Sequence, residues 1–470
     1  MTDYTSLFNV TREQMRNLLS TALSSGGDYA DLFFEHSISE SMRLRDGMVN
    51  SAGCDIDFGV GIRVVAGGHT GYAFSESTAY ADMEKAARSA AAIASSPFTK
   101  GRQVEMRPTE FRSRYRMEGS WDDFSVERRK EYLMQLDEMI KAADGRIVKV
   151  FGSLSNERTQ VMFCNSLGDF FCELRPMCSL VATCIARQGT TSETVTFSRS
   201  HRCGSEMLTP ALQRRFADEI AAKIRPLFEA RRPKGGEMAV VMGAGSSGIL
   251  LHEAVGHAFE ADFNRKGISI FSDKMGCKVC SDNISIVDDA TVEGNRGAVS
   301  IDDEGVPGQK TYMVRNGVLE SYLHDRISAT HYGVAPTGNG RRESFRFNPI
   351  PRMRATYMEG GQGTAEDIIR SCSNGIYVDN FTNGQVQIGA GDFTFFVKSG
   401  YLIEDGRLTA PIKDINIIGN GPQAIADIRE VADDCTIDDS TWTCGKDQSC
   451  YVSCGMPTVL VSRLTVGGGN

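Results

Sequence analysis

Two histidines and a glutamate lie within six residues of one another, at His252, Glu253 and His257. Neutral imidazole nitrogen is a common zinc ligand, and a carboxylate beside such a ligand can take a proton from a metal-activated water. The surrounding segment 250–260 is rich in Leu, Ala, Val and Phe, which predicts a helix. The three residues therefore predict the core of a metallopeptidase site.

The spacing of the two histidines differs from that of the HExxH arrangement, in which they are four residues apart and share a helix face. A separation of five residues turns the second side chain by about 140° from the first on a regular helix. The two rings can converge if one turn widens to a π-type bulge, or if the helix is distorted at Gly256. The alternative is a pair of ordinary helix histidines beside a capping or surface glutamate.

The motif runs from His252-Glu253-Ala254-Val255-Gly256-His257 into Glu260-Ala261-Asp262-Phe263-Asn264-Arg265-Lys266-Gly267. In this form it strongly resembles the TldD branch of the TldD/PmbA metallopeptidases, which carry HExxxH in place of HExxH. Three further segments carry the resemblance over nearly the whole chain: Tyr29-Ala30-Asp31-Leu32-Phe33-Phe34-Glu35-His36, Thr337-Gly338-Asn339-Gly340-Arg341-Arg342-Glu343-Ser344 and Leu464-Thr465-Val466-Gly467-Gly468. The resemblance favours the metal site over ordinary helix histidines.

A catalytic zinc normally has three protein ligands, and no residue near the two histidines completes the set by spacing. The resemblance implies a cysteine in a Cys-Gly-Lys segment, which is present here at Cys444. The chain departs from the family pattern just beyond, where Cys450 and Cys454 follow. Either thiol could compete for the metal or trap Cys444 in a disulfide. His324 is a further ligand candidate, or a group that supports a ligand or lines the substrate pocket.

Other side chains could also take part in metal binding. Cys277 and Cys280 form a CxxC pair, which could join the tail cysteines in a structural zinc site. A lone CxxC is more simply two thiols on a strand or loop. Glu260 and Asp262 could accept hydrogen bonds from ligating imidazoles, or could pair with the basic residues that follow them on a solvated surface.

Composition limits the class of protein. The chain has 470 residues, enough to bury a substantial core, and a formal net charge of −9, which argues against a general nucleic-acid binder. No secretory signal and no apolar run of about eighteen residues is visible. The thirteen scattered cysteines then indicate free thiols in a reducing compartment. We expect a cytoplasmic protein that contacts neither membrane nor nucleic acid directly.

The pattern of the chain predicts an α+β fold. Pro233-Lys234-Gly235-Gly236 marks a boundary between a mixed α/β N-terminal domain, residues 1–232, and a mostly β C-terminal domain, residues 236–470, which carries the metal-binding helix. The glycine-rich connector 243–248 lacks the lysine and hydroxyl of a phosphate-binding loop, so we expect a tight turn that brings the helix against the preceding strand.

Periodicity and capping signals place the elements. Helices are expected at 11–25, 80–95, 125–143, 209–229, 365–372 and 423–431. Strands are expected at 29–36, 41–49 and 237–242, and several between 148 and 186 with a turn at 156–158. Hairpin turns are expected at Gly67-Gly68, Asn316-Gly317 and Asp405-Gly406.

Residues and resemblance together predict a zinc-dependent peptidase, with one zinc per chain on His252, His257 and Cys444. Glu253 would deprotonate the attacking water and pass the proton to the leaving amine. The resemblance implies short or unfolded polypeptide substrates, and a dimer with itself or with a PmbA-like subunit. Candidates for substrate binding are Tyr322, His324, Arg341 and Arg342.

Two alternatives stay open. The first is a non-catalytic scaffold or partner subunit, since members of the PmbA branch lack the metal motif. The second is a hydrolase that uses the same site on a non-peptide amide or ester.

Overall fold

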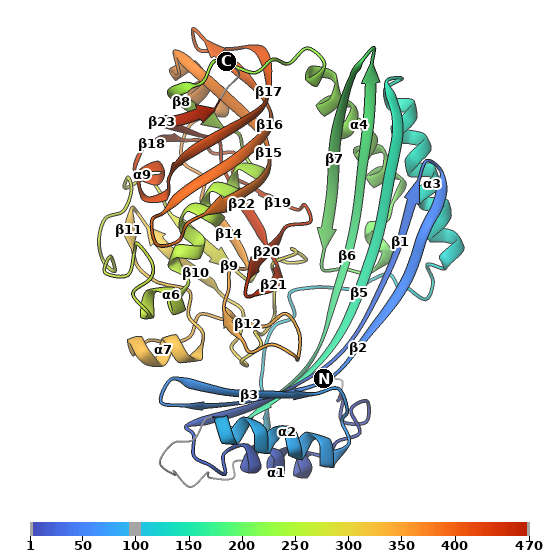
Figure 1. Ribbon diagram of the computed structural model, residues 1–470, viewed down its shortest axis with the longest axis vertical. Coiled ribbons are helices and arrows are strands. Elements are labelled where there is room, and N and C mark those ends of the chain that lie inside the picture. The colour runs from blue at the N-terminus through green and yellow to red at the C-terminus, as the bar shows by residue number, and fades with distance from the viewer. Residues whose placement is uncertain (1–2, 94–104, 468–470) are drawn as a thin grey trace.

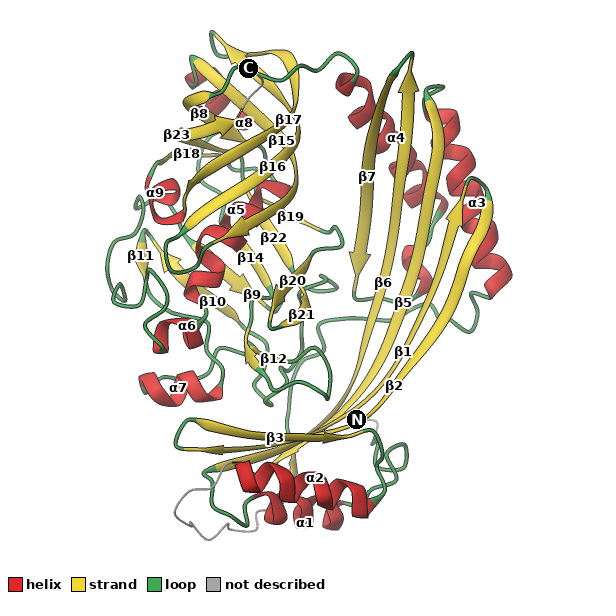
Figure 2. Ribbon diagram, in the orientation of Figure 1, coloured by secondary structure: helices red, strands yellow, loops and turns green. Residues whose placement is uncertain are grey.

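The computed structural model describes residues 3–93 and 105–467. The chain forms an N-terminal half built on one long, curved sheet and a C-terminal half of shorter strands and helices (Figures 1 and 2). This is the mixed α/β architecture, with a mostly β C-terminal part, that the sequence predicts. Within the described ranges, no helix combines the length and the apolar character needed to cross a membrane.

The N-terminal sheet consists of long, mostly antiparallel strands. Its order is β3-β2-β1-β5-β6, and both β4 and β7 also pair with β6. The strands are β1 (Tyr29–Arg45), β2 (Met48–Ala66), β3 (His69–Ser75), β4 (Arg107–Pro108), β5 (Ile147–Asn165), β6 (Asp169–Gln188) and β7 (Thr191–His201).

Two pairs of helices cover one face of this sheet. The helices are α1 (Arg12–Ala22), α2 (Tyr80–Ile93), α3 (Val126–Ala143) and α4 (Pro210–Leu227). The even-numbered residues of β1 turn toward them: Leu32 and Phe34 pack with α1 and α2, whereas Met42 and Leu44 pack with α3 and α4. Because side chains alternate along a strand, Phe33 lies on the opposite face, where it packs with Ile301 and Phe345 of the C-terminal half.

The C-terminal half contains two larger sheets. One has the order β11-β10-β9-β14-β22-β19, and the other β17-β16-β15-β8-β23-β18, with a further pairing of β17 and β23 that closes it on itself. Their strands are β8 (Gly236–Met242), β9 (Ile286–Asp289), β10 (Lys310–Arg315), β11 (Val318–Leu319), β14 (Ala355–Met358), β15 (Asn374–Val386), β16 (Asp392–Glu404), β17 (Arg407–Asn420), β18 (Ile428–Val431), β19 (Thr436–Asp438), β22 (Ser453–Met456) and β23 (Val459–Gly467).

Shorter elements complete this half. Two small hairpins are β12 (Gly340–Arg341) with β13 (Ile350–Pro351), and β20 (Thr443–Lys446) with β21 (Gln448–Tyr451). The helices are α5 (Ile249–Leu251), α6 (Ala261–Arg265), α7 (Arg326–Tyr332), α8 (Ala365–Ser371) and α9 (Gly421–Ala426). The histidine motif lies between α5 and α6, in the centre of the largest apolar core.

Most predicted elements are present. The capping box of Thr11 and Gln14 starts α1, and the three predicted hairpin turns join β2 to β3, β10 to β11 and β16 to β17. The predicted end of the second helix at residues 94–95 lies outside the described residues. The glycine connector is a tight turn, since a Cβ on Gly248 would lie 2.3 Å from the backbone nitrogen of Gly455 on β22.

Three element predictions were wrong. No turn occurs at 156–158, because β5 continues to Asn165 and the amide of Asn156 donates to Glu40 on β1 (3.0 Å). The segment 41–49 is not one strand, since Asp46 and Gly47 form the turn between β1 and β2. The segment 423–431 is not one helix, because α9 ends at Ala426 and β18 follows, paired with β23.

A buried arginine joins the two halves. Arg63 on β2 is fully buried and donates to Asp31 on β1 (2.8 Å) and to Glu304 of the C-terminal half (2.6 Å). Nearby, the backbone N–H of Phe345 donates to Glu35 (2.6 Å). Burying charge without a partner is costly, so these polar contacts fix how the halves meet.

The buried carboxyl of Glu35 makes stability depend on pH. Burial raises the pKa of Glu35 to about 8, although the hydrogen bond from Phe345 opposes this. The unfolded chain ionises this group near its ordinary pKa, so its contribution to stability is present at low pH and is lost as pH rises toward 8. We expect Glu35→Gln to gain stability relative to wild type between pH 5 and 8, by about a few kcal/mol. Denaturant unfolding at both pH values measures this, with the exposed Glu131→Gln as control. Equal pH dependence in wild type and Glu35→Gln would contradict the assignment.

Candidate metal centre

The histidine motif does not form a regular α-helix. Residues His252–Gly256 are a π-helical turn, in which the backbone N–H of His257 donates to the carbonyl of His252. Five residues therefore complete about one turn, and the two imidazole rings lie side by side with centroids 5.0 Å apart. Of the two ways in which the spacing allows the rings to converge, the structure has the widened turn.

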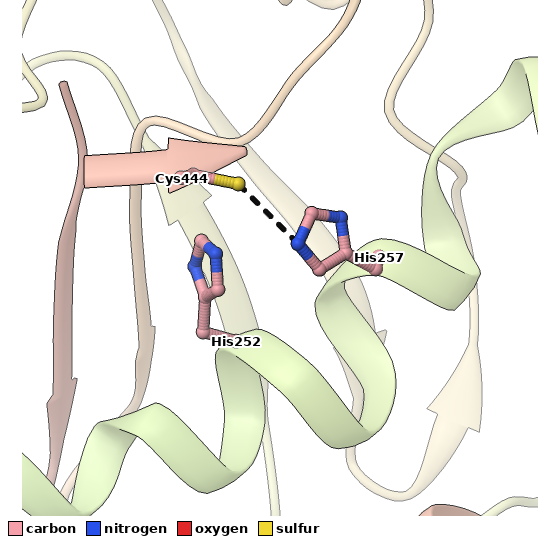
Figure 3. Close-up of side chains that lie close together, drawn as sticks. All are labelled: His252, His257 and Cys444. Atoms are coloured by element: carbon pink, nitrogen blue, oxygen red, sulfur yellow. Dashed lines mark hydrogen bonds between the residues drawn. The ribbon is translucent and has the colours of Figure 1, made fainter. Parts of the chain in front are cut away.

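Cys444 joins the two histidines from β20, as Figure 3 shows. Its Sγ lies 3.3 Å from Nε2 of His257, and the candidate ligand atoms of the three residues lie within 4.8 Å of one another. All three side chains are buried. Within the described parts of the chain, this is the group of His, Cys, Asp or Glu residues arranged to hold a metal ion.

The cluster favours the thiolate form of Cys444. Burial opposes ionisation of the thiol, but the charges and hydrogen bonds of His252 and His257 outweigh it and lower the pKa of Cys444 to about 4. Thiolate is the form that binds metal. The cysteine is therefore ready as a ligand at neutral pH.

A buried carboxylate contacts Nδ1 of His257, whereas Nε2 of the same ring is the nitrogen near Cys444. Nδ1 of His257 lies 3.0 Å from Glu260, which is fully buried and also lies 3.1 Å from Nζ of Lys446. Glu260 therefore contacts the imidazole of a candidate metal ligand, as in the first of the two roles that the sequence left open. Asp262 pairs with Lys446 (2.7 Å) and so supports the same hairpin. Burial alone would lower the pKa of His257, but the charge of Glu260 raises it well above its ordinary value.

The residues present fit a zinc ion. Nδ1 of His252 is buried and has no hydrogen-bond partner among the described residues, so a cation could satisfy this imidazole. Two imidazoles and one thiolate are donors that zinc accepts, and a set of three protein ligands is typical of a catalytic site.

Glu253 follows His252 directly and is partly buried. Burial raises the pKa of its carboxyl, whereas the charges of His252 and His257 oppose the rise. A Cβ on Gly384 of β15 would lie 2.4 Å from the ring of Phe395 and 3.3 Å from Cγ of Glu253, so the backbone of Gly384 packs closely on both side chains.

The other tail cysteines lie outside the three-residue group. Cys450 is the cross-strand neighbour of Cys444 in the β20–β21 hairpin, and its Sγ lies 3.6 Å from Nη1 of Arg352. Cys454 lies on β22, where burial raises the pKa of its thiol well above the ordinary value. All described cysteines are free thiols, including the exposed Cys277 and the buried Cys280.

The four side chains that the sequence suggests for substrate binding are buried and make contacts within the protein. Tyr322 donates to the carbonyl of Phe271 (2.6 Å), and His324 lies 3.3 Å from Ser328, with its pKa lowered to about 4 by burial. Arg341 and Arg342 belong to the interface between the halves, where they donate to the backbone carbonyls of Tyr451 (2.7 Å) and Asp303 (3.0 Å), respectively. Their role in substrate binding stays a prediction.

Sequence reasoning missed two cations that hold the cluster. Lys446 had a signal, because it belongs to the Cys-Gly-Lys segment. Arg352 had none: it is fully buried, donates to the carbonyl of Cys444 (2.6 Å) and lies 3.8 Å from Glu260.

Fold and site together define an α+β protein with a buried His-His-Cys centre on a π-helical turn. Comparison with known proteins agrees over nearly the whole chain. Three family models match: the PmbA/TldA metallopeptidase domain 1 at residues 30–94, the central domain at 119–225 and the C-terminal domain at 235–468.

Individual relatives agree with the family models. The chain is 36% identical to the metalloprotease TldD homolog of Haemophilus influenzae, over 98% of this chain and 97% of that protein. A zinc metalloprotease TldD homolog of Saccharolobus solfataricus is 33% identical over 50% of this chain and 53% of its own. The crystal structure of TldE from Thermococcus kodakarensis shares the fold, with a TM-score of 0.76 at 19% identity over 97% of this chain and all of that one. The chain belongs to the TldD/PmbA family of metallopeptidases.

The geometry predicts which substitutions remove metal binding. We expect metal-free wild type to take up about one zinc per chain on titration, and His257→Ala and Cys444→Ser to bind it at least about 100-fold more weakly, because each loses a ligand atom. Elemental mass spectrometry after dialysis measures the bound metal. Cys450→Ser is the matched control and should retain zinc. Full zinc retention in Cys444→Ser would instead transfer the third-ligand role to another residue.

Proposed function

We propose that this protein is a zinc-dependent peptidase that hydrolyses peptide bonds in short or unfolded polypeptides. The observation that carries the proposal is the convergence of His252, His257 and Cys444 beside the free carboxyl of Glu253. The names of its relatives, metalloprotease and in one case zinc metalloprotease, support the same reaction class.

Each residue has a defined part in this reaction. His252, His257 and Cys444 hold the ion, which when bound lowers the pKa of a water and polarises the scissile carbonyl. Glu253 takes a proton from the water and delivers it to the leaving amine. Burial raises the pKa of Glu253, which makes its carboxylate a stronger base toward the water.

A cleft between the two halves supports a chain-like substrate. It has a volume of about 840 Å³ and lies between β7 and α4 on one side and β15, β16 and the segment before β20 on the other. Its lining includes Trp442, two residues from Cys444, and Thr382, two residues from the Gly384 that packs on Glu253. An extended polypeptide in this cleft would pass close to the proposed metal centre.

Replacing the proposed base should separate metal binding from catalysis. We expect Glu253→Gln to retain zinc and to lose at least about 100-fold in peptide cleavage, because the water would lack its proton acceptor. Turnover of fluorogenic peptides and of an unfolded protein by the zinc-loaded enzyme measures this, with the exposed Glu237→Gln as control. Undiminished cleavage by Glu253→Gln would refute its role. Zinc-loaded wild type that cleaves neither substrate would favour the non-catalytic scaffold.

We propose further that the protein assembles as a dimer, with itself or with a PmbA-like subunit. One observation supports an edge-to-edge contact: in β2, the stretch 48–57 is exposed, and among the described strands it pairs with β1 alone. Ile56 on this edge is 63% exposed and Met48 is 72% exposed. Free strand edges with exposed apolar side chains readily pair with another chain.

Light scattering after size exclusion tests the assembly. For a homodimer, we expect the protein alone to have a mass of twice 51.3 kDa. For a heterodimer, we expect the two proteins to elute together, with the summed mass of one copy of each, when a PmbA-like subunit is present. Ile56→Glu should weaken the dimer, because it places a charge on the proposed edge, whereas Ile268→Glu, at a residue 49% exposed elsewhere, should not. A monomer under both conditions would refute the proposal.

A further inference from the structure

A second polar cavity lies between the two halves, on the side of the β20–β21 hairpin that carries Cys450 and Tyr451. Its volume is about 180 Å³, enough for a group of several heavy atoms. Strands β1, β5 and β6 form one wall, and loops of the C-terminal half form the other. Neither His252 nor His257 lines it. The cavity is therefore separate from the proposed metal centre.

Five guanidinium groups line this cavity: those of Arg175, Arg202, Arg341, Arg342 and Arg354. Two of them have carboxylate partners, since Arg175 pairs with Glu173 (2.7 Å) and Arg342 with Asp31 (3.3 Å). The other three form no ion pair within the described residues.

The three unpaired arginines are all more than nine-tenths buried. Arg341 and Arg354 donate to backbone carbonyls, which satisfy hydrogen bonds but do not neutralise the charge. The side chain of Arg202 is 7% exposed and makes no hydrogen bond to the described chain. Burial lowers the pKa of Arg354 to about 9, and the neighbouring charge of Arg341 adds to the effect. The carboxylates of Asp303 and Asp302 oppose this lowering.

Four carboxyl groups also line the cavity. They are Glu35, Glu157, Asp303 and Glu343. Asp303 pairs with Arg175, and burial raises the pKa of Glu35 to about 8. Glu157 accepts from the hydroxyl of Tyr451 (2.8 Å) and Glu343 from the N–H of Ser449 (2.6 Å), both neutral donors. Within the described residues, none of the four carboxyl groups forms an ion pair with Arg202, Arg341 or Arg354.

We propose that this cavity binds a small oxyanion of the phosphate class, held by Arg202, Arg341 and Arg354. An oxyanion would supply the negative partner that these three buried guanidinium groups lack, and guanidinium groups bind phosphate oxygens through paired N–H donors. The hydroxyl groups of Ser344 and Ser449 line the same space and can donate to further oxygens. Because both halves of the chain supply ligands, the bound anion stabilises their contact.

The cavity also borders the β20–β21 hairpin, which carries Cys444. Ser449, Cys450 and Tyr451 on β21 line the cavity, and Cys450 faces Cys444 across the hairpin. Arg341 holds the carbonyl of Tyr451 (2.7 Å), so an anion that fixes Arg341 also fixes β21. The anion site does not depend on the peptidase proposal, and either can fail without the other.

Calorimetric titration of the full-length protein with sodium phosphate tests the proposal, with sodium acetate and sodium chloride at equal ionic strength as comparison salts. We expect saturable phosphate binding with about one site per chain, and a higher melting temperature in phosphate than in either other salt. Arg202→Gln and Arg354→Gln should each weaken binding at least about tenfold, because each removes a charged donor. The exposed Arg214→Gln should bind as wild type does.

Arg202→Gln is expected to fold normally, since it loses no hydrogen bond present in the described chain. Phosphate binding that persists in Cys444→Ser would separate this cavity from the metal centre. The proposal is overturned if wild type shows no phosphate-specific binding, or if both arginine variants retain wild-type affinity.

Discussion

Glu260 holds a negative charge in a fully buried position, and three groups from different parts of the chain share it. Nδ1 of His257 lies 3.0 Å from the carboxylate, Nζ of Lys446 3.1 Å and Nε of Arg352 3.8 Å. Burial alone would raise the pKa of Glu260, but the charges of Lys446 and His257 lower it to about 2. Removing any one partner leaves a buried charge only partly compensated, which is strongly unfavourable. The motif segment, β20 and the chain before β14 are thereby held at one point, and Cys444 lies two residues from Lys446.

The sequence predicts the parts of this arrangement that depend on local geometry. A separation of five residues between His252 and His257 can bring the rings together only through a widened turn or a distortion, and the structure has the π turn. Cys444 is different, because it meets His257 across 187 positions of sequence. No spacing rule reaches that far, so the resemblance to the TldD branch alone pointed to it. Arg352 had neither a motif nor a local pattern, since its partners are a backbone carbonyl and a carboxylate set by the tertiary fold.

The turn wrongly expected at 156–158 shows a second limit. A run of Asn, Glu and Arg favours a turn on composition, yet in β5 these residues lie in the middle of a long strand. Their polar side chains have partners on neighbouring elements: Asn156 donates to Glu40, and Glu157 accepts from Tyr451 of the hairpin (2.8 Å). A sheet face that packs against a polar interface does not show the apolar alternation by which strands are recognised. The same interface contacts the β20–β21 hairpin, which carries Cys444, from the N-terminal half.

The chemistry of the centre follows from the charge of its ligands. A thiolate in place of a third neutral imidazole would reduce the formal charge of a bound zinc complex from +2 to +1, which weakens its action as a Lewis acid. Within the proposed mechanism, more of the work then falls on Glu253, whose pKa is raised by burial and whose side chain packs on the backbone of Gly384. A weaker Lewis acid would be expected to give slow turnover and a narrow range of substrates. Such a balance would suit the proposed peptidase, in which access to the cleft between the two halves would select the substrate before it reaches the metal centre.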